Sequence, residues 1–499
     1  MDYDFTKLQN GSDIRGIALA GVEGENPNLG PVEAARIAEG FLVWLTHRTG
    51  KPCDALKVAM GSDPRLSRPI LAENIVRAVT AHGTEVLNAG IASTPAMFMS
   101  TVFPETACDG AVMITASHLP FNRNGFKFFT RDGGLDKKDI REIIEYAQSD
   151  SKLDELPFSA DFAPEKKSDL MKLYSAHLRN LIISATGDER PLEGMKICVD
   201  AGNGSGGFYA EDVLKPLGAD ISASQFLQPD GTFPNHAPNP ENREAMRSIS
   251  EKVVSSGCDF GIIFDTDVDR SAAVDRYGRE ISRNGIVAMA ASLVCEEHPG
   301  TTIVTDSITS DQLTEYLEEA LGMKHLRFKR GYKNVINKAI ELNENGEECW
   351  LAIETSGHAA LKENYFLDDG AYLATKIVIK AAKLRKEGKT LDSLLENLKE
   401  PLEASEVRFP ITVPDFSQYA DMVLENFKNW ANREGITVVT PNYEGVRLSF
   451  GSGWCLLRKS LHDPIMPLNV ESDIAGGTDD ILNRVYSFLS DFDGIDTGR

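Results

Sequence analysis

The sequence predicts an α/β protein with mostly parallel sheet, followed by a smaller α+β domain at the C-terminus. Two observations support this fold class. Amphipathic helical segments alternate with short β-branched runs up to about residue 400, as in repeated βαβ units. Beyond that point, short runs of antiparallel type accompany two helical segments. Because 499 residues exceed what one hydrophobic core holds together, we expect three or four domains.

The N-terminal segment shows the alternation. Residues 31–48, PVEAARIAEGFLVWLTHR, have the apolar spacing of an amphipathic helix. Residues 55–63, ALKVAMGSD, are expected to form a strand and a loop. A helix that ends at glycine is expected over 69–83, PILAENIVRAVTAHG, and a further strand over 85–90, EVLNAG. Helix and strand therefore alternate, which favours a parallel sheet.

The end of the chain has a different character. EVRFPITV (406–413), VRLSF (446–450) and GWCLLRKS (453–460) indicate antiparallel strands, with helices around 415–434 and 478–490. A separate α+β domain is the simplest interpretation.

Several changes in composition mark candidate boundaries. They lie near 155–165, near 278–281 and near 400. A further segment, QPDGTFPNHAPNP (228–240), holds four prolines and is expected to be irregular.

Charge and composition exclude several classes of partner. The net charge is -23 and no basic run occurs, so nucleic acid and anionic membranes are not expected to bind. No apolar run approaches the roughly 20 residues that span a bilayer, and the acidic N-terminus has neither a signal-peptide nor a transit-peptide pattern. The seven cysteines are scattered without a CxxC pair, which indicates a reducing, cytoplasmic location.

One unit recurs along the chain: a short apolar strand that ends in a small polar loop. It occurs at AVMITASH (111–118), KICVDAGNGSGG (196–207), GIIFDTDVDR (261–270) and WLAIETSGH (350–358). In open α/β sheets, ligands bind beyond the carboxyl ends of the strands. The chemistry is therefore expected in these loops.

The loop after the third of these strands is a candidate metal site. Asp265, Asp267 and Asp269 alternate there, and three such close carboxylates repel one another unless a hard cation lies among them. A solvated acidic turn is the alternative. An EF-hand loop is excluded, because Arg270 and Arg276 occupy its glycine and glutamate positions. A phosphatase of the haloacid-dehalogenase pattern, with Asp265 as nucleophile, stays open. Arg270 beside the carboxylates suits a site that holds metal and phosphate together.

Two further loops carry polar groups in small turns. Glu354, Ser356 and His358 offer a carboxylate, a hydroxyl and an imidazole that can bind a polyol, although a serine helix cap is the alternative. Ser117 and His118 follow the first strand, where a structural turn serine is the alternative to a reactive hydroxyl.

Cations gather in two other places of this acidic chain. The segment FKRGYK (328–333) is either an anion contact or a solvated face. Arg458, Ser460 and His462 follow a strand, where a guanidinium and a hydroxyl can hold a phosphate, with a surface turn as the alternative.

In combination, these motifs resemble the α-D-phosphohexomutases, a family that includes phosphoglucomutases, phosphomannomutases and phosphoglucosamine mutases. The resemblance covers essentially the whole chain. It rests on TASH with NGFK (115–127), DTDVDR (265–270), ETSGH (354–358) and RKS (458–460), in that order. Two more family motifs match, DIRG at 13–16 and the proline-rich segment that includes DGTFPNHAPNP.

The resemblance implies a four-domain phosphohexomutase architecture with a central active-site cleft. Three related α/β domains with mixed sheets are expected, followed by a C-terminal α+β domain. The expected ranges are 1–160 with the serine loop, 161–280 with the metal loop, 281–401 with the sugar-binding loop and 402–499 with the phosphate-binding loop.

The resemblance also implies roles for individual residues. Ser117 would carry a phosphoryl group and, with the three aspartates, hold Mg²⁺. Lys127, His118 and Arg270 would complete the catalytic group, with Lys127 as the expected base. The substrate contacts would come from Arg15, Lys329, Glu354, Ser356, His358, Arg458, Ser460 and His462.

The function that follows is an isomerase that interconverts hexose 1-phosphate and hexose 6-phosphate, of glucose or mannose, through a phosphoserine and a hexose 1,6-bisphosphate. A phosphoglucosamine mutase is the second possibility within the family. Outside this reaction class, a sugar phosphatase that uses Asp265 and a non-catalytic sugar-phosphate-binding protein stay open. A phosphorylated hexose is the expected partner, and the chain is expected to be a monomer or homodimer.

The chain departs from the family pattern at several positions. Leu119 replaces the usual asparagine of the serine loop, Thr266 a small residue of the metal loop, and Ile353 the glycine before the sugar-loop glutamate. The phosphate loop differs most: residues 458–464 read RKSLHDP where the family has R-x-S-(G/N)-T-E-P, and Pro467 stands at a usual arginine. These changes bear on sugar-phosphate preference more than on the chemistry.

Overall fold

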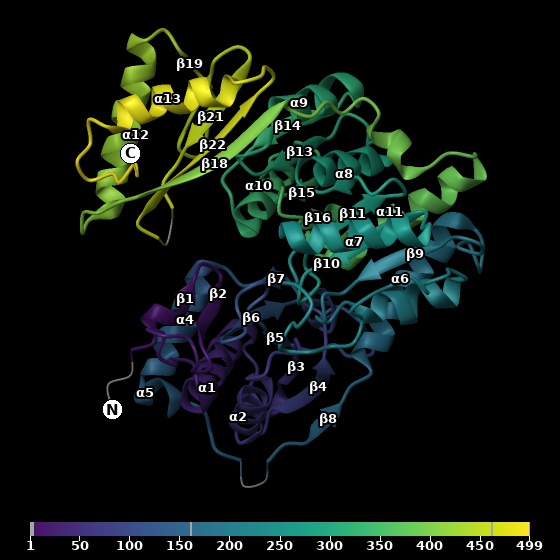
Figure 1. Ribbon diagram of the computed structural model, residues 1–499. Helices are drawn as coiled ribbons and strands as arrows, with labels where there is room; N and C mark the ends of the chain where they lie inside the picture. Colours follow the sequence, from purple (N-terminus) through teal and green to yellow (C-terminus); the bar gives the residue numbers. More distant parts are fainter. Residues whose placement is uncertain (1–3, 160–161, 461–462, 499) are drawn as a thin grey trace. The chain divides into compact units, whose positions relative to one another are not determined.

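The computed structural model describes residues 4–159, 162–460 and 463–498 (Figure 1). The chain forms two compact units. One contains the residues up to Leu293 together with Ser356–Leu395, and the other contains Val294–Thr355 together with Glu396–Arg499. The boundary at Leu293 falls within helix α8 (Asn284–Glu297).

The first sheet of the first unit is mixed. Its strand order is β1-β2-β6-β5-β3-β4-β8, with β7 beside β6. The central strands β3, β4 and β5 are parallel, whereas β6 and β2 run antiparallel to their neighbours. The strand bounds are β1 Gln9–Asn10, β2 Asp13–Ile17, β3 Lys57–Ser62, β4 Glu85–Ile91, β5 Gly110–Ile114, β6 Arg123–Thr130, β7 Gly133–Gly134 and β8 Glu165–Lys167.

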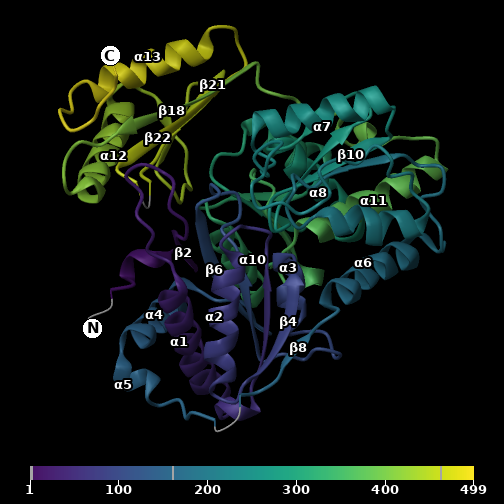
Figure 2. The same ribbon diagram turned by 60° about the horizontal axis from the view of Figure 1, so that its bottom comes forward.

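Helices α1, α2 and α4 pack together against this sheet (Figure 1, Figure 2). The helices of this region are α1 Pro31–Thr49, α2 Arg68–Thr80, α3 Thr94–Met99, α4 Lys137–Gln148 and α5 Asp150–Leu153. The helices and strands predicted for the N-terminal segment are confirmed, except that α2 ends at Thr80 and not at Gly83.

Helix α1 shows how the local sequence sets the ends of a helix. Pro31 occupies the first turn, where its missing N–H leaves no hydrogen bond unmade. The side chain of Glu33 accepts a hydrogen bond of 2.8 Å from the Gly30 amide. The helix ends at Gly50 with φ +69°, a conformation that glycine adopts without strain. Its buried side, which includes Phe41, joins the core of this region.

The second sheet of the first unit contains the metal loop. Its order is β12-β11-β10-β9, with β9 parallel to β10 and the other pairs antiparallel. The bounds are β9 Ile197–Asp200, β10 Phe260–Phe264, β11 Ser271–Asp275 and β12 Glu280–Ile281, with helices α6 Leu170–Thr186 and α7 Arg243–Ser256. Segment 228–240 forms no helix or named strand, as predicted.

The same unit also contains the antiparallel hairpin of β16 (Ala359–Leu361) and β17 (Leu367–Asp368), followed by α11 (Gly370–Lys386). Helix α11 packs on α6 and on β11. It begins at Asp369, whose side chain accepts a hydrogen bond of 2.8 Å from the Tyr372 amide and so caps the helix.

The second unit has a parallel and an antiparallel part. Strands β14, β13 and β15 are parallel, and β18-β22-β21-β20-β19 form an antiparallel sheet. The parallel part has β13 Thr302–Thr305, β14 Lys324–Arg327, β15 Cys349–Ile353, α9 Asp311–Glu315 and α10 Tyr332–Glu344. The antiparallel part has β18 Glu403–Pro410, β19 Thr437–Val438, β20 Val446–Ser449, β21 Gly453–Leu457, β22 Ile465–Ser472, α12 Phe416–Arg433 and α13 Gly477–Leu489.

The predicted fold class is confirmed: α/β regions with mixed sheets precede a C-terminal α+β domain. Strand β22 was missed, because Pro464 and Pro467 obscure its pattern. The carbonyl of Pro467 nevertheless accepts a hydrogen bond of 3.1 Å from the Arg458 amide. A proline therefore contributes to this sheet through its carbonyl.

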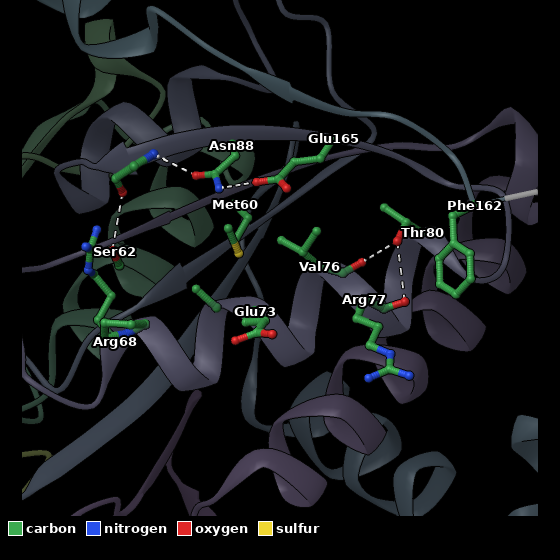
Figure 3. A pocket seen from close by; sticks show the side chains of 13 residues that line it. Met60, Ser62, Arg68, Glu73, Val76, Arg77, Thr80, Asn88, Phe162 and Glu165 are labelled. Atoms are coloured by element: carbon green, nitrogen blue, oxygen red, sulfur yellow. Dashed lines mark hydrogen bonds between the residues drawn. The ribbon is translucent and has the colours of Figure 1, made fainter.

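A hollow of about 510 Å³ lies between α2 and strands β4 and β8 (Figure 3). Arg68 and Arg77 line it from α2, whereas Asn88 and Glu165 line it from the two strands and share a hydrogen bond of 2.6 Å. None of the residues predicted for the active site is among the described residues that line this hollow. Within the described ranges, every helix is too short or too polar to cross a bilayer.

Candidate active site

The serine loop leaves the carboxyl end of β5. Ser117 lies three residues beyond the strand, is 8% exposed and has φ +48°, in the left-handed region that serine rarely adopts. Its amide donates a hydrogen bond of 2.9 Å to Thr115 Oγ1. The strand end and the turn together present the hydroxyl at the edge of the sheet.

The metal loop joins β10 to β11, whose register pairs Phe264 with Ser271. Asp265, Asp267 and Asp269 are fully buried, and each has a carboxylate oxygen within 4.8 Å of one in the others. The tight hairpin brings alternate side chains to one point. This arrangement gives three carboxylates that converge, as the sequence predicts for a cation site.

The two loops meet at Ser117. Its hydroxyl donates a hydrogen bond of 3.0 Å to Asp265 Oδ2, and Arg270 donates one of 3.2 Å to Ser117 Oγ. Arg270 is itself buried and forms an ion pair of 3.2 Å with Asp265. A group carried on this hydroxyl would therefore lie between a guanidinium and the carboxylate cluster.

The electrostatics of the cluster are uneven. Burial, and then the charges of Asp269 and Asp267, raise the pKa of Asp265 well above its ordinary value. Burial opposes ionisation of Asp269 too, but Lys127, His358 and Arg270 outweigh it and hold the pKa of Asp269 below its usual range. The neighbouring cations therefore offset the cost of ionising Asp269, but they do not offset the cost of ionising Asp265.

The donor set fits a divalent cation. Asp267 Oδ1 and Asp269 Oδ1 are buried and have no hydrogen-bond partner among the described residues. A buried carboxylate oxygen without a hydrogen-bond partner lowers the stability of the fold unless a ligand binds it. Hard cations such as Mg²⁺ prefer carboxylate oxygens, so these residues could hold one.

Lys127 and His118 lie beside the two loops. Lys127, on β6, is buried, donates to Asp269 Oδ2 and lies 3.8 Å from Asp267 Oδ2. His118 Nδ1 lies 3.5 Å from Ser117 Oγ. Burial, followed by the charge of Arg270, lowers the pKa of His118 to about 3. His118 is therefore neutral at physiological pH.

Arg15 and His358 also reach this region. Arg15, on β2, donates to the carbonyl of Thr115. His358 Nδ1 lies 2.9 Å from Ser356 Oγ, and its Nε2 lies 3.8 Å from Asp269 Oδ1. The structure thus gathers Arg15, Ser117, His118, Lys127, the three aspartates, Arg270, Ser356 and His358 in the first unit.

The remaining predicted residues belong to the second unit. Glu354 follows β15 and accepts a hydrogen bond of 2.7 Å from the Gly331 amide. The next residue, Thr355, donates one of 2.8 Å to Asp306, which follows β13 and is fully buried. Arg330 Nε lies 3.7 Å from the same carboxylate. The ends of two parallel strands therefore fix the loop that carries Glu354.

The phosphate loop begins at the end of β21. Burial, and then the positive charge of Arg330, lower the pKa of Arg458. Its Nε is buried without a hydrogen-bond partner in the described part of the chain. An anion beside these two guanidinium groups would be stabilised.

Three other residues predicted to contact the substrate belong to this part of the chain. Ser460 Oγ accepts a hydrogen bond of 3.2 Å from the Asp463 amide. The ammonium of Lys329 lies 5.9 Å from the centre of the Phe328 ring. His462 lies outside the described residues.

Several residues at the site were not predicted from the sequence. Asp63 and Arg65 follow β3 and lie beneath the serine loop, and Thr94 donates a hydrogen bond of 2.5 Å to Asp267 Oδ2. Asp306 supports the sugar loop in the same way. A usable signal existed for Asp63 and Asp306, because each directly follows a buried parallel strand.

Comparison with known proteins gives a consistent result. Models described as phosphoglucomutase/phosphomannomutase, alpha/beta/alpha domains I, II and III, match residues 6–154, 172–278 and 282–401. A phosphoglucomutase of Neisseria gonorrhoeae is 30% identical over 87% of this chain and 88% of its own length. A phosphomannomutase/phosphoglucomutase of Pseudomonas putida is 27% identical over 84% of each. A crystal structure of a phosphoglucomutase/phosphomannomutase family protein of Burkholderia thailandensis superimposes with a TM-score of 0.76, at 25% identity and 96% coverage of both chains.

Proposed function

Because the chain belongs to the phosphoglucomutase/phosphomannomutase family, we propose that it interconverts the 1- and 6-phosphates of glucose or mannose through a phosphoserine at Ser117. The chain is a phosphohexomutase, that is, an isomerase of the phosphoglucomutase/phosphomannomutase type. A hexose 1,6-bisphosphate is the intermediate and the activator.

The reaction comprises two phosphoryl transfers. In the first, a sugar hydroxyl attacks the phosphorus on Ser117, the Ser117 Oγ–P bond breaks, and the hydroxyl proton passes to a base. In the second, after the bisphosphate has turned over, Ser117 Oγ attacks its other phosphate. The sugar oxygen leaves with a proton, and the enzyme regains its phosphoserine.

The observation that carries the proposal is the environment of the Ser117 hydroxyl. It contacts Asp265 at 3.0 Å and Arg270 at 3.2 Å, in an interior position 8% exposed. An ordinary turn serine has no need of a buried guanidinium and a cluster of three carboxylates. Positioning and charge stabilisation are what phosphoryl transfer requires of a protein.

Asp265, Asp267 and Asp269 would hold Mg²⁺ together with the phosphate on Ser117. When bound, the ion would spread the negative charge of the transferring group. Arg270 stabilises the same charge from its own side of Ser117. Lys127 is assigned the proton transfer with His118 as the alternative, since the first contacts Asp269 and the second lies beside Ser117 Oγ.

The remaining residues recognise the sugar phosphate. Glu354, Ser356 and His358 would bind sugar hydroxyls, and Arg15 and Lys329 would contact the substrate near them. Arg458, Ser460 and His462 would hold the phosphate that does not react. The buried Nε of Arg458 supports this assignment.

A substrate panel tests the proposal. The chain is assayed with the 1-phosphates of glucose, mannose, glucosamine and N-acetylglucosamine, with Mg²⁺ and glucose 1,6-bisphosphate, and kcat/KM is compared. The highest values are expected for glucose or mannose. A preference for glucosamine would assign the other branch of the family. Peptide mass analysis should find phosphate on Ser117, and a phosphoryl group trapped on Asp265 would instead indicate the phosphatase reaction.

A further inference from the structure

Arg65 is a fully buried arginine beneath the serine loop, outside the group of residues to which the reaction has been assigned. An arginine side chain has five N–H donors in a fixed planar fork. In Arg65, all five N–H groups donate hydrogen bonds. Their acceptors, at 2.5–3.2 Å, are Asp63 Oδ2 and the carbonyls of Ser117, Leu119, Pro120 and Arg123. A single guanidinium thus binds four carbonyls of the loop that carries Ser117.

Asp63 completes the support from the other side of Ser117. Its Oδ2 accepts a hydrogen bond of 2.7 Å from the Thr115 hydroxyl, whose oxygen in turn accepts one of 2.9 Å from the Ser117 amide. Arg65 holds the Ser117 carbonyl at 2.5 Å. The peptide groups before and after Ser117 are therefore both tied to the buried pair of Asp63 and Arg65.

This double support explains how Ser117 keeps its backbone conformation. A serine with φ +48° lies in a sparsely populated region that costs on the order of 1 kcal/mol or more, and such a residue persists only when its surroundings over-determine it. Turning Ser117 to an ordinary conformation would redirect both its amide and its carbonyl, and would break both contacts.

A second loop covers Arg65. The Phe233 ring lies 5.4 Å from the guanidinium, and Gly231 pairs with the Arg65 backbone. A Cβ atom at Gly231 would clash with the Pro64 carbonyl, so only glycine permits this approach. Farther along the same loop, Asn239 Oδ1 accepts a hydrogen bond of 3.2 Å from Arg270.

We propose that Arg65 is the positioning residue of the serine loop, and that Phe233 holds it in place. Arg65 touches no reacting atom: it acts by fixing the backbone of Ser117 so that the hydroxyl points to Asp265 and Arg270. Loop 231–239 contacts both Arg65 and Arg270. It therefore aligns Arg65, which fixes the backbone of Ser117, with Arg270, which donates a hydrogen bond to the Ser117 hydroxyl. The inference rests on the proposed role of Ser117.

The test compares Arg65→Lys and Phe233→Leu with the wild-type chain. Lysine keeps the charge but has three donors on one atom, so it cannot bind four carbonyls in a plane. Arg77→Lys is the matched control, because Arg77 is an exposed arginine on α2 that lines the hollow of Figure 3. The readouts are kcat and KM for the mutase reaction, and amide hydrogen exchange of peptides that span 115–125.

Arg65→Lys should lower kcat by about 100-fold and change KM by less than about threefold, because misplacement of a reacting group by 1 Å has an effect of this size. Exchange in 115–125 should become at least about tenfold faster, since the Leu119 and Arg123 amides donate within this loop. Phe233→Leu should change both readouts in the same directions and less strongly. Arg77→Lys should change neither.

Unchanged exchange in 115–125 in both variants, or an unchanged kcat in a folded Arg65→Lys variant, would overturn the inference. If Arg65→Lys does not fold, by circular dichroism and thermal unfolding, Phe233→Leu decides: faster loop exchange supports the inference and wild-type exchange overturns it. Failure of the proposed function would look different. In that case Ser117→Ala would remain active, whereas the exchange experiment would still report on the loop.

Discussion

The hydroxyl of Ser117 donates a hydrogen bond to Asp265, a residue 148 positions away in the chain. One residue follows a strand of the first sheet and the other follows a strand of the second, and both belong to the same compact unit. A negatively charged group on this serine would be attracted by Arg270 and would need a cation between it and the carboxylate of Asp265. This contact links the serine loop to the metal loop.

Ser117→Ala should reduce mutase activity by at least about 1,000-fold, because the acceptor and donor of the phosphoryl group is removed. The fold should persist, since the backbone contacts of residue 117 do not involve its hydroxyl. Coupled assays, intact-mass analysis and thermal unfolding measure these effects. Ser151→Ala, at an exposed serine on α5, is the control. Activity within tenfold of wild type in Ser117→Ala would contradict the assignment.

Asp267→Asn should weaken Mg²⁺ dependence and activity together. The Thr94 hydroxyl donates a hydrogen bond to Asp267 Oδ2. In the variant, the side-chain oxygen of the asparagine should therefore take the place of Oδ2. The asparagine NH₂ group would then take the place of Oδ1, which is the unpartnered oxygen that suits a cation. The Mg²⁺ concentration for half-maximal rate should rise about tenfold or more, measured by titration after chelation. An unchanged titration would remove Asp267 from the metal site.

The sequence identified the two loops but not the contacts that hold them. Asp265, Asp267 and Asp269 could be predicted because strand, turn and carboxylate alternation are local patterns. Arg65 and Thr94 could not, since their roles come from tertiary packing: Arg65 reaches residues 52–58 positions away and Thr94 reaches Asp267. Secondary-structure propensity and hydrophobic periodicity are local signals, so they do not predict contacts between residues far apart in the sequence.

The loop at 201–207 illustrates the same limit. It follows a strand, as the serine and metal loops do, yet it supports another loop. The Ser205 amide donates a hydrogen bond of 2.8 Å to the Thr266 carbonyl, and a Cβ atom at Gly204 would lie 2.6 Å from that oxygen. The strand-then-loop pattern therefore indicates where a loop lies at the sheet edge, but which loop meets a ligand depends on the packing of the domains.

Stability should depend on pH through Glu471, in the C-terminal sheet. Burial raises the pKa of Glu471 to about 7, against the attraction of Arg447. The folded state then binds this proton more tightly than the unfolded chain, whose glutamate pKa is near 4.5. The stabilisation is present below about pH 4.5 and is lost as the pH rises through 7.

Glu471→Gln should remove this loss. The glutamine oxygen can still accept the hydrogen bond of 3.0 Å from Trp454 Nε1. Relative to wild type, the free energy of unfolding of the variant should increase between pH 5 and pH 8 by on the order of 1–3 kcal/mol. Urea unfolding at the two pH values, followed by Trp fluorescence, measures the difference. A constant difference between wild type and variant would show that Glu471 does not titrate in this range.

The phosphate loop is where the chain departs most from its family. Arg458→Ala should raise KM by about 10–100-fold and change kcat by less than about threefold, because a contact to the non-reacting phosphate is equally strong before and during the reaction. Lys459→Ala is the control: its ammonium donates to Asp421 on α12 at 2.7 Å, so its loss should leave KM within about twofold. Initial rates over a range of hexose 1-phosphate concentrations give both constants. Equal KM values for Arg458→Ala and wild type would exclude Arg458 from substrate binding, and a larger rise for Lys459→Ala than for Arg458→Ala would move the phosphate contact to the neighbouring lysine.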